Sequence, residues 1–233
     1  MKKLVIIFYF TTIVFFTGCQ TNNDGVVIPT QDTSATTFFS GVACDQIIDK
    51  KYYTICYDYG YKGALFVAYT LDGNIVNDPN IEERPNFYDE MSIPSAYRSR
   101  WEDYTGSGYD RGHLASDASF DYNQTALESV YSMANIVPQD PELNRSAWID
   151  TEYLERSKAV EYGSVDVVIG VVYGDNPQRI GEDEIAVPQM FYKKISNKLL
   201  GYEACYQYEN IPYDTQTDSL EDHVVSCQYF PNY

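Results

Sequence analysis

Runs of apolar and β-branched residues, each closed by polar turn residues, predict the strands of a sheet. Residues 64–71 form one such run, and the Asp72-Gly73 pair that follows it is typical of a hairpin turn. Residues 165–173 combine valine, isoleucine and glycine in an almost continuous apolar run, which predicts a buried central strand.

Further strands and one long helix complete the predicted elements. Residues 187–195 predict a strand, provided that Pro188 lies at a sheet edge or at the start of the strand. Residues 224–230 predict another strand. Residues 144–162 predict the main helix, because a proline lies just ahead of the segment and a glycine just past it. Strands, one central helix and then strands predict an α+β fold with a central, mainly antiparallel sheet flanked by helices.

The N-terminus has the pattern of an export signal. Lys2 and Lys3 precede the uncharged apolar run of residues 4–16, which is the length of a signal-peptide core and shorter than a membrane span. The run ends in Phe-Thr-Gly-Cys, which resembles the lipobox of bacterial lipoproteins and predicts lipid attachment at Cys19. An ordinary cleaved signal with an incidental cysteine is the alternative.

The composition of the chain divides it into three segments. Residues 1–18 are the predicted lipoprotein signal peptide, and residues 19–37, rich in polar residues, are the predicted lipid-anchored flexible tether. Residues 38–233 have an even composition without repeats and are predicted to form a single domain.

The remaining cysteines are even in number, as expected of an exported protein with disulfides. Four cysteines allow three pairings. The choice that is local in sequence joins Cys44 to Cys56 and Cys205 to Cys227. Four buried free thiols are the alternative.

Charge and apolar content set limits on the class of protein. Apolar residues make up 44% of the 233 residues, which is enough to bury a core and excludes wholesale disorder, collagen and a coiled coil. The formal net charge of −18 argues against a nucleic-acid ligand, because proteins that bind nucleic acids usually present a basic face. The motifs below test that argument.

Residues that could take part in catalysis surround one of the two histidines. His113 follows Asp110-Arg111-Gly112, so an acid, a base, a flexible glycine and an imidazole are consecutive. A histidine in such a segment can act as a general base near neutral pH, although a single histidine is more often structural.

A second cluster begins before the predicted helix and continues into it. Asn144 stands near the start of the helix, where it is either an N-cap or an oxygen ligand for a hard divalent cation. Mg²⁺ is usually held by one or two protein groups and keeps several waters, so one carboxamide oxygen is sufficient when substrate phosphate completes the site.

The order and spacing of these motifs resemble the DNA/RNA non-specific endonucleases, the ββα-metal nucleases with a DRGH motif. The shared elements are Asp-Arg-Gly-His at 110–113, Asn-x-x-Pro-Gln at 135–139 and Asn-x-x-x-Trp-x-x-x-Glu at 144–152. The interval of 31 residues between His113 and Asn144 also fits that family. Upstream, Arg84 lies in a segment similar to the one that carries the family's catalytic arginine.

The resemblance implies a role for each matching residue. It implies that His113 is the general base, that Asn144 binds Mg²⁺ and that Glu152 positions a metal-bound water. It further implies that Arg84 stabilises charge in the transition state and that Arg156 is a second functional arginine. Residues with an implied supporting role are Asp110, Arg111 and Asn135. Mn²⁺, which takes the same oxygen ligands, is expected to substitute for Mg²⁺.

Helical geometry leaves a choice between two glutamates for the metal shell. Glu152 lies about 80° around the helix and roughly 12 Å along it from Asn144, whereas Glu155 lies only about 20° around it. A water-mediated role therefore suits Glu152, and Glu155 is the rival on helix face alone. For either residue, the alternative is a solvated helix face.

The other charged residues are predicted to be structural or solvent-exposed. His223 is predicted to be structural, and the acidic run at residues 182–184 is predicted to be a solvated loop. Lys193 and Lys194 are predicted to lie on the surface for solubility, with a phosphate contact as the alternative.

The motifs outweigh the charge and predict an exported, Mg²⁺-dependent, sugar-non-specific endonuclease. The resemblance implies that it hydrolyses DNA and RNA to 5′-phosphorylated oligonucleotides. The expected location is the bacterial cell envelope, lipid-anchored and facing the periplasm or the exterior. The alternative is a non-catalytic, lipid-anchored envelope module that binds glycan or protein, which the acidity and the 23 tyrosines would fit.

Overall fold

A seven-stranded antiparallel sheet is the framework of the protein. The computed structural model describes residues 43–77, 80–214 and 216–230, and all the elements and contacts below lie within these ranges. The strand order is β1-β2-β3-β6-β9-β10-β11, and each neighbouring pair is antiparallel. Their bounds are β1 (Gln46–Asp49), β2 (Thr54–Asp58), β3 (Gly63–Asp72), β6 (Ser164–Val172), β9 (Met190–Asn197), β10 (Tyr202–Glu209) and β11 (Val224–Val225).

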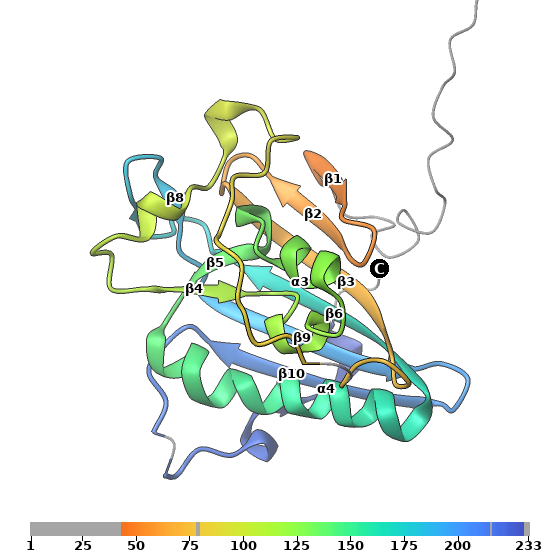
Figure 1. The fold of residues 1–233 in the computed structure, drawn as a ribbon. Coiled ribbons are helices and arrows are strands. Elements are labelled where there is room, and N and C mark those ends of the chain that lie inside the picture. Colours follow the sequence, from red (N-terminus) through yellow and green to blue (C-terminus); the bar gives the residue numbers. More distant parts are fainter. Residues whose placement is uncertain (1–42, 78–79, 215, 231–233) are drawn as a thin grey trace, which may run out of the picture. The chain divides into compact units, whose positions relative to one another are not determined.

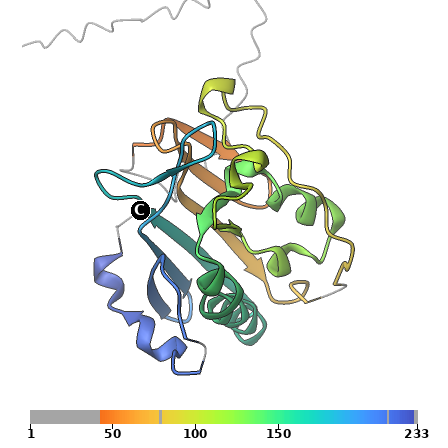
Figure 2. The same ribbon diagram turned by 90° about the vertical axis from the view of Figure 1, so that its left-hand side faces the viewer.

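One face of this sheet is buried, and the alternation of side chains along the central strands shows which one. In β6, Val165, Val167 and Ile169 are buried while the residues between them are half-buried. The long helix α4 (Trp148–Tyr162) packs on β3, β6 and β9. Figures 1 and 2 show α4 and the segment that carries β4 and β5 on the same face of the sheet. The predicted α+β architecture is confirmed.

The segment between β3 and β6 carries the candidate site. Its elements ahead of η4 (Leu143–Ala147) and α4 are η1 (Ser95–Tyr97), η2 (Trp101–Tyr104), β4 (Asp110–His113), α2 (Asp117–Phe120), α3 (Gln124–Val130), η3 (Met133–Asn135) and β5 (Ile136–Gln139). β4 and β5 pair as a separate antiparallel ribbon. This ribbon and the following α4 give the order β-β-α around the histidine.

The predicted helix is present, but its first turn differs from the expectation. A turn of π-helix, η4 (Leu143–Ala147), precedes α4, which ends at Gly163 with a φ of 82°. Asp140 caps this segment, because its Oδ1 accepts bonds from the backbone N–H groups of Glu142 and Leu143. The backbone N–H of Asn144 already donates to the carbonyl of Asp140 at 2.8 Å. Asn144 is therefore not the N-cap, and its side chain is free for another role.

Two local predictions are wrong. Asp72-Gly73 does not close a hairpin, because β3 pairs with β2 and β6 and the intervening chain leaves the sheet after the turn. Gly73 instead lies against the end of α4, where an added Cβ would come within 2.1 Å of the Ala159 carbonyl oxygen. The strand predicted for residues 224–230 is shorter than expected, because only Val224–Val225 is a strand, flanked by η5 (Leu220–His223) and η6 (Cys227–Tyr229).

Two short strands, β7 (Arg179–Ile180) and β8 (Ile185–Ala186), pair apart from the main sheet.

Both predicted disulfides are present. Cys44 is bonded to Cys56 of β2, and Cys205 of β10 is bonded to Cys227. The second bond ties the C-terminal segment to the sheet. The predicted signal peptide, tether and Cys19 lie outside the described residues. Within the described ranges, no helix is long and apolar enough to cross a membrane.

Candidate active site

Side chains alternate along β4, so that the candidate base lies on one side of the strand and the partner of Asn144 on the other. Asp110 and Gly112 point to one side of the ribbon, and Arg111 and His113 point to the other. On the first side, the Gln139 side chain lies against Gly112, where an added Cβ would come within 2.2 Å of its Oε1. Glycine is therefore required at this position by close packing between the two strands of the ribbon.

His113 lies in an aromatic pocket with one ring nitrogen unpaired. Its ring centroid is 4.9 Å from that of Tyr131 and 5.5 Å from that of Phe87. Within the described part of the chain, its buried Nε2 atom has no hydrogen-bond partner. Burial lowers the pKa of His113 to about 4, with Asp117 opposing that shift and Arg84 adding to it. The imidazole is therefore neutral at pH 7 and can accept a proton.

Two carboxylates hold Arg84 beside the histidine. Its Nη2 atom is 2.8 Å from Asp117 Oδ1 and 3.1 Å from Asp121 Oδ2. The Tyr131 hydroxyl donates to the other oxygen of Asp117. Because Asp117 and Asp121 lie four residues apart on and just after α2, one helical turn positions both partners of the arginine.

The other side of β4 orients the candidate metal ligand. The Asn144 side-chain amide nitrogen donates to Asp110 Oδ2 at 2.9 Å. Arg145 binds the same carboxylate through two bonds of 2.7 and 2.6 Å. Because the nitrogen of the Asn144 amide is engaged, its carbonyl oxygen is left as the group that can accept a bond or bind a cation.

Glu152 and Arg156 lie one turn apart on α4 and extend the site. Burial raises the pKa of the Glu152 carboxyl to about 7, while Lys193 and Arg156 lower it and Glu155 raises it. Ser116, three residues after His113, also interacts with this carboxyl. Arg156 is buried, and its Nη1 atom has no hydrogen-bond partner in the described structure. Its charge also acts to lower the pKa of Asp121, so Arg156 lies within electrostatic reach of both Glu152 and this partner of Arg84.

The side chains that could bind a metal at this site offer hard oxygen donors, which fit a cation such as Mg²⁺. In the described ranges, no group of three or more His, Cys, Asp or Glu side chains could enclose a metal ion. The Asn144 carbonyl oxygen is the donor that the contact with Asp110 leaves open, and the Glu152 carboxylate lies about two helical turns further along the chain. Such a sparse set suits a cation that retains most of its waters and takes phosphate oxygens from a substrate.

The contacts of Glu155 exclude it as an alternative to Glu152 in the metal shell. Its carboxylate accepts bonds from Tyr69 and Ser119 and pairs with Lys193 Nζ at 2.9 Å. Both side chains of the ion pair are fully buried. The predictions of a solvated face for Glu155 and a surface position for Lys193 are wrong, because β9 presents Lys193 to the face that α4 covers.

Asn135 and Arg111 support the site in different ways. The fully buried Asn135 amide bonds to the backbone of Ala115 in both directions and to the Val130 carbonyl. It thereby fixes the chain that follows His113. Arg111 instead contacts aromatic rings and donates to the Trp101 carbonyl at 3.1 Å.

The remaining predicted residues lie apart from these contacts. His223 stacks on Tyr208 at 3.8 Å, and its Nε2 atom lies 2.7 Å from Asp218 Oδ1. Residues 182–184 form a loop, but Asp183 is not simply solvated, because Arg100 Nη1 binds it at 2.5 Å. Sequence reasoning missed Asp117, Asp121 and Tyr131, although the i, i+4 spacing of the two aspartates was a readable signal.

The fold and the site together define a class. A histidine on the first strand of a β-β-α unit, with an asparagine at the start of its helix, is the arrangement of the ββα-metal nucleases. Residues 30–219 match the sequence profile described as DNA/RNA non-specific endonuclease. The chain therefore belongs to the DNA/RNA non-specific endonuclease family, whose members depend on divalent metals.

Named relatives agree with this family. Human mitochondrial Endonuclease G is 31% identical over 182 residues, covering 72% of this chain and 61% of the human protein. Mitochondrial Nuclease 1 of Schizosaccharomyces pombe is 29% identical, covering 70% of this chain and 56% of that protein. The chain thus spans about six tenths of the length of these relatives. EndoG in a crystal structure of its complex with EndoGI superposes with a TM-score of 0.76 and 25% identity, covering 86% of this chain and 89% of that one.

Proposed function

We propose that the protein is an exported, Mg²⁺-dependent endonuclease that hydrolyses DNA and RNA without sugar specificity. The observation that carries the proposal is the arrangement on β4. This strand presents the neutral His113 on one side and, through Asp110, orients the Asn144 amide on the other. Family membership supplies the reaction class, and these side chains supply the parts that the reaction needs.

The attack on phosphorus needs a base and a charge stabiliser. His113 takes a proton from a water molecule, and the resulting hydroxide forms a bond to phosphorus. The bond from phosphorus to the 3′ oxygen then breaks, which leaves a 5′-phosphate and a 3′-hydroxyl. Arg84, fixed by Asp117 and Asp121, places positive charge where the phosphate becomes more negative.

The helix side of the site serves the leaving oxygen. Asn144 would hold Mg²⁺ directly and Glu152 would reach it through a bound water, and the cation would supply Lewis-acid stabilisation of phosphate and leaving-group charge. Mn²⁺ would serve in its place. Glu152 holds a water that returns a proton to the departing 3′ oxygen, and the charge of Arg156 acts to lower the pKa of the Glu152 carboxyl, which favours its ionised form.

Plasmid cleavage tests this proposal with a matched pair of histidine variants. The purified protein should nick and then degrade plasmid DNA and RNA with Mg²⁺ and leave both intact in EDTA. His113→Ala should lower turnover about 10²- to 10⁴-fold. His223→Ala removes the other histidine and should leave turnover unchanged. Intact plasmid under both metal conditions, or full activity of His113→Ala, would contradict the proposal.

Location is a separate part of the proposal. Cleavage after residue 18 and lipid attachment at Cys19 would tether the enzyme to the bacterial envelope, facing the periplasm or the exterior. The two disulfides fit an oxidising compartment. Fractionation tests this part, because the wild-type protein should sediment with membranes whereas Cys19→Ser should be soluble. No observation in the described structure favours the alternative of a non-catalytic glycan- or protein-binding module.

A further inference from the structure

Trp101 is an exposed tryptophan held in a fixed position near the candidate active site. It begins η2 and is 46% exposed. Its backbone carbonyl accepts a bond from Arg111 Nη2, and its ring lies 5.9 Å from the guanidinium carbon of Arg111. The indole thus presents aromatic surface to the solvent, and tryptophan is enriched at interfaces because its ring is apolar while its N–H is polar.

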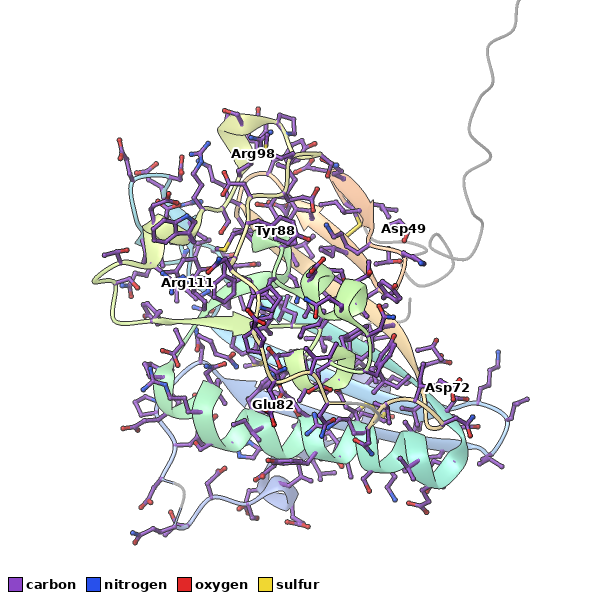
Figure 3. The ribbon with its side chains drawn as sticks, viewed as in Figure 1. Asp49, Asp72, Glu82, Tyr88, Arg98 and Arg111 are labelled. Carbon is purple, nitrogen blue, oxygen red and sulfur yellow. A yellow bond between two sulfur atoms is a disulfide. The ribbon has the colours of Figure 1, made fainter. Side chains whose placement is uncertain are left out.

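Arg111 connects this indole to the histidine. Arg111 and His113 point to the same side of β4, and Figure 3 labels Arg111 on that strand. Phe87 lies between them, with its ring 5.5 Å from the Arg111 guanidinium and 5.5 Å from the His113 ring. A continuous run of His113, Phe87, Arg111 and Trp101 thus leads from the reacting centre to the surface.

We propose that Trp101, braced by Arg111, is a stacking platform for an unpaired nucleobase next to the phosphodiester that is cut. The proposal rests on the proposed nuclease function and adds a subsite to it. Every base has a π face, so stacking suits an enzyme that does not select sequence. Arg111 adds positive charge beside the ring, and its buried Nε atom has no hydrogen-bond partner among the described residues.

The same geometry assigns a preference among substrates. A base in a duplex is already stacked on its neighbours and has to be unstacked before it can cover an indole. An unpaired base meets no such cost. The Trp101 subsite should therefore favour single strands and locally opened duplexes over intact duplexes.

Tryptophan emission provides a direct probe, because the chain has only two tryptophans. Trp148 is 1% exposed, so the solvent-accessible emission comes from Trp101. The experiment uses the His113→Ala protein with Mg²⁺, so that strands bind without being cut. Titration with single-stranded oligothymidylate, which does not pair with itself, should quench the emission. Absence of quenching, or absence of measurable binding, would overturn the proposal.

Affinity measurements with labelled strands separate stacking from structural damage. Adding Trp101→Ala should weaken oligothymidylate binding by about 5- to 100-fold and leave duplex binding nearly unchanged. Trp101→Phe should retain affinity within about threefold, because it keeps an aromatic face. Tyr97→Ala removes a comparably exposed ring (41%), which stacks on Tyr59, and should have no effect.

The affinity and cleavage results together distinguish failure of the Trp101 subsite from failure of the nuclease function. Equal losses for single and double strands, or no loss in Trp101→Ala, would overturn the subsite. Plasmid cleavage by the protein with His113 intact reports on the nuclease function independently. Cleavage with an unchanged oligothymidylate affinity in Trp101→Ala would refute the subsite alone.

Discussion

Replacing Glu152 by glutamine is expected to stabilise the metal-free protein at alkaline pH while it abolishes catalysis. Burial raises the pKa of this carboxyl from its ordinary value near 4.5 to about 7. The folded protein therefore prefers the protonated side chain, and it has to ionise an unfavourably placed group as the pH rises. Glutamine has nearly the same shape and never ionises, so it removes that cost.

The magnitude follows from proton linkage. A carboxyl whose pKa is raised on folding contributes stability that is fully present below pH 4.5 and is lost as the pH rises through 7. A tenfold change in the acid dissociation constant corresponds to about 1.4 kcal/mol. The advantage of Glu152→Gln over wild type should therefore grow from about 1 kcal/mol at pH 5 to about 3 kcal/mol at pH 8. At pH 8 that corresponds to a rise in Tm of about 6–12 °C for a domain of this size.

Urea unfolding in EDTA at pH 5 and pH 8 measures this difference, with plasmid cleavage measured on the same samples. Glu155→Gln on the same helix is the contrast. It leaves the fully buried Lys193 without its partner and should destabilise the protein at both pH values. A stability difference for Glu152→Gln that does not grow with pH would refute the assignment of a raised pKa to this carboxyl.

Three further results are expected from the contacts of the site and the sheet. Asp110→Ala releases the Asn144 amide and should raise the Mg²⁺ concentration for half-maximal cleavage about 10- to 100-fold; an unchanged requirement would show that this bond does not orient the ligand. Arg84→Ala should lower turnover more than substrate affinity, and an equal loss of both would mark it as a plain phosphate contact. Replacing Cys205 and Cys227 by serine should lower the free energy of unfolding by about 3 kcal/mol in urea melts, because the unfolded chain gains conformational entropy. An unchanged free energy of unfolding would contradict this explanation.

The sheet and the main helix could be predicted because their signals are local. The apolar run at residues 165–173 gives the central strand β6, and the glycine after residue 162 ends α4 with a positive φ. Both disulfides followed from the short sequence separation of their cysteines. Asp72-Gly73 failed as a hairpin signal, because a turn pair does not determine whether the next segment returns to the sheet or leaves it.

The positions of charged side chains could not be predicted from the sequence. Lys193 alternates with apolar residues in a strand pattern, but only the packing of α4 over β9 shows that it is buried against Glu155. The cap at Asp140 depends on the π turn that precedes α4. The motif predicted His113 and Asn144, whereas the bond that the Asn144 amide donates to Asp110 appears only when β4 and the helix are placed together.

The ion pairs of the site show how an acidic chain could bind a nucleic acid. A net charge of −18 argued against a nucleic-acid ligand, yet the chain belongs to a nuclease family. Two arginines of the site add little to an open basic track, because Arg84 is held by two carboxylates and Arg145 by Asp110. We therefore expect long-range attraction of a polyanion to be weak and a nucleic-acid strand to be bound through a few contacts at short range. Salt should accordingly weaken binding with a shallow slope, set by only a few displaced counterions. Stacking on Trp101 does not depend on counterion release, so an acidic protein can use it where further lysines would otherwise be needed.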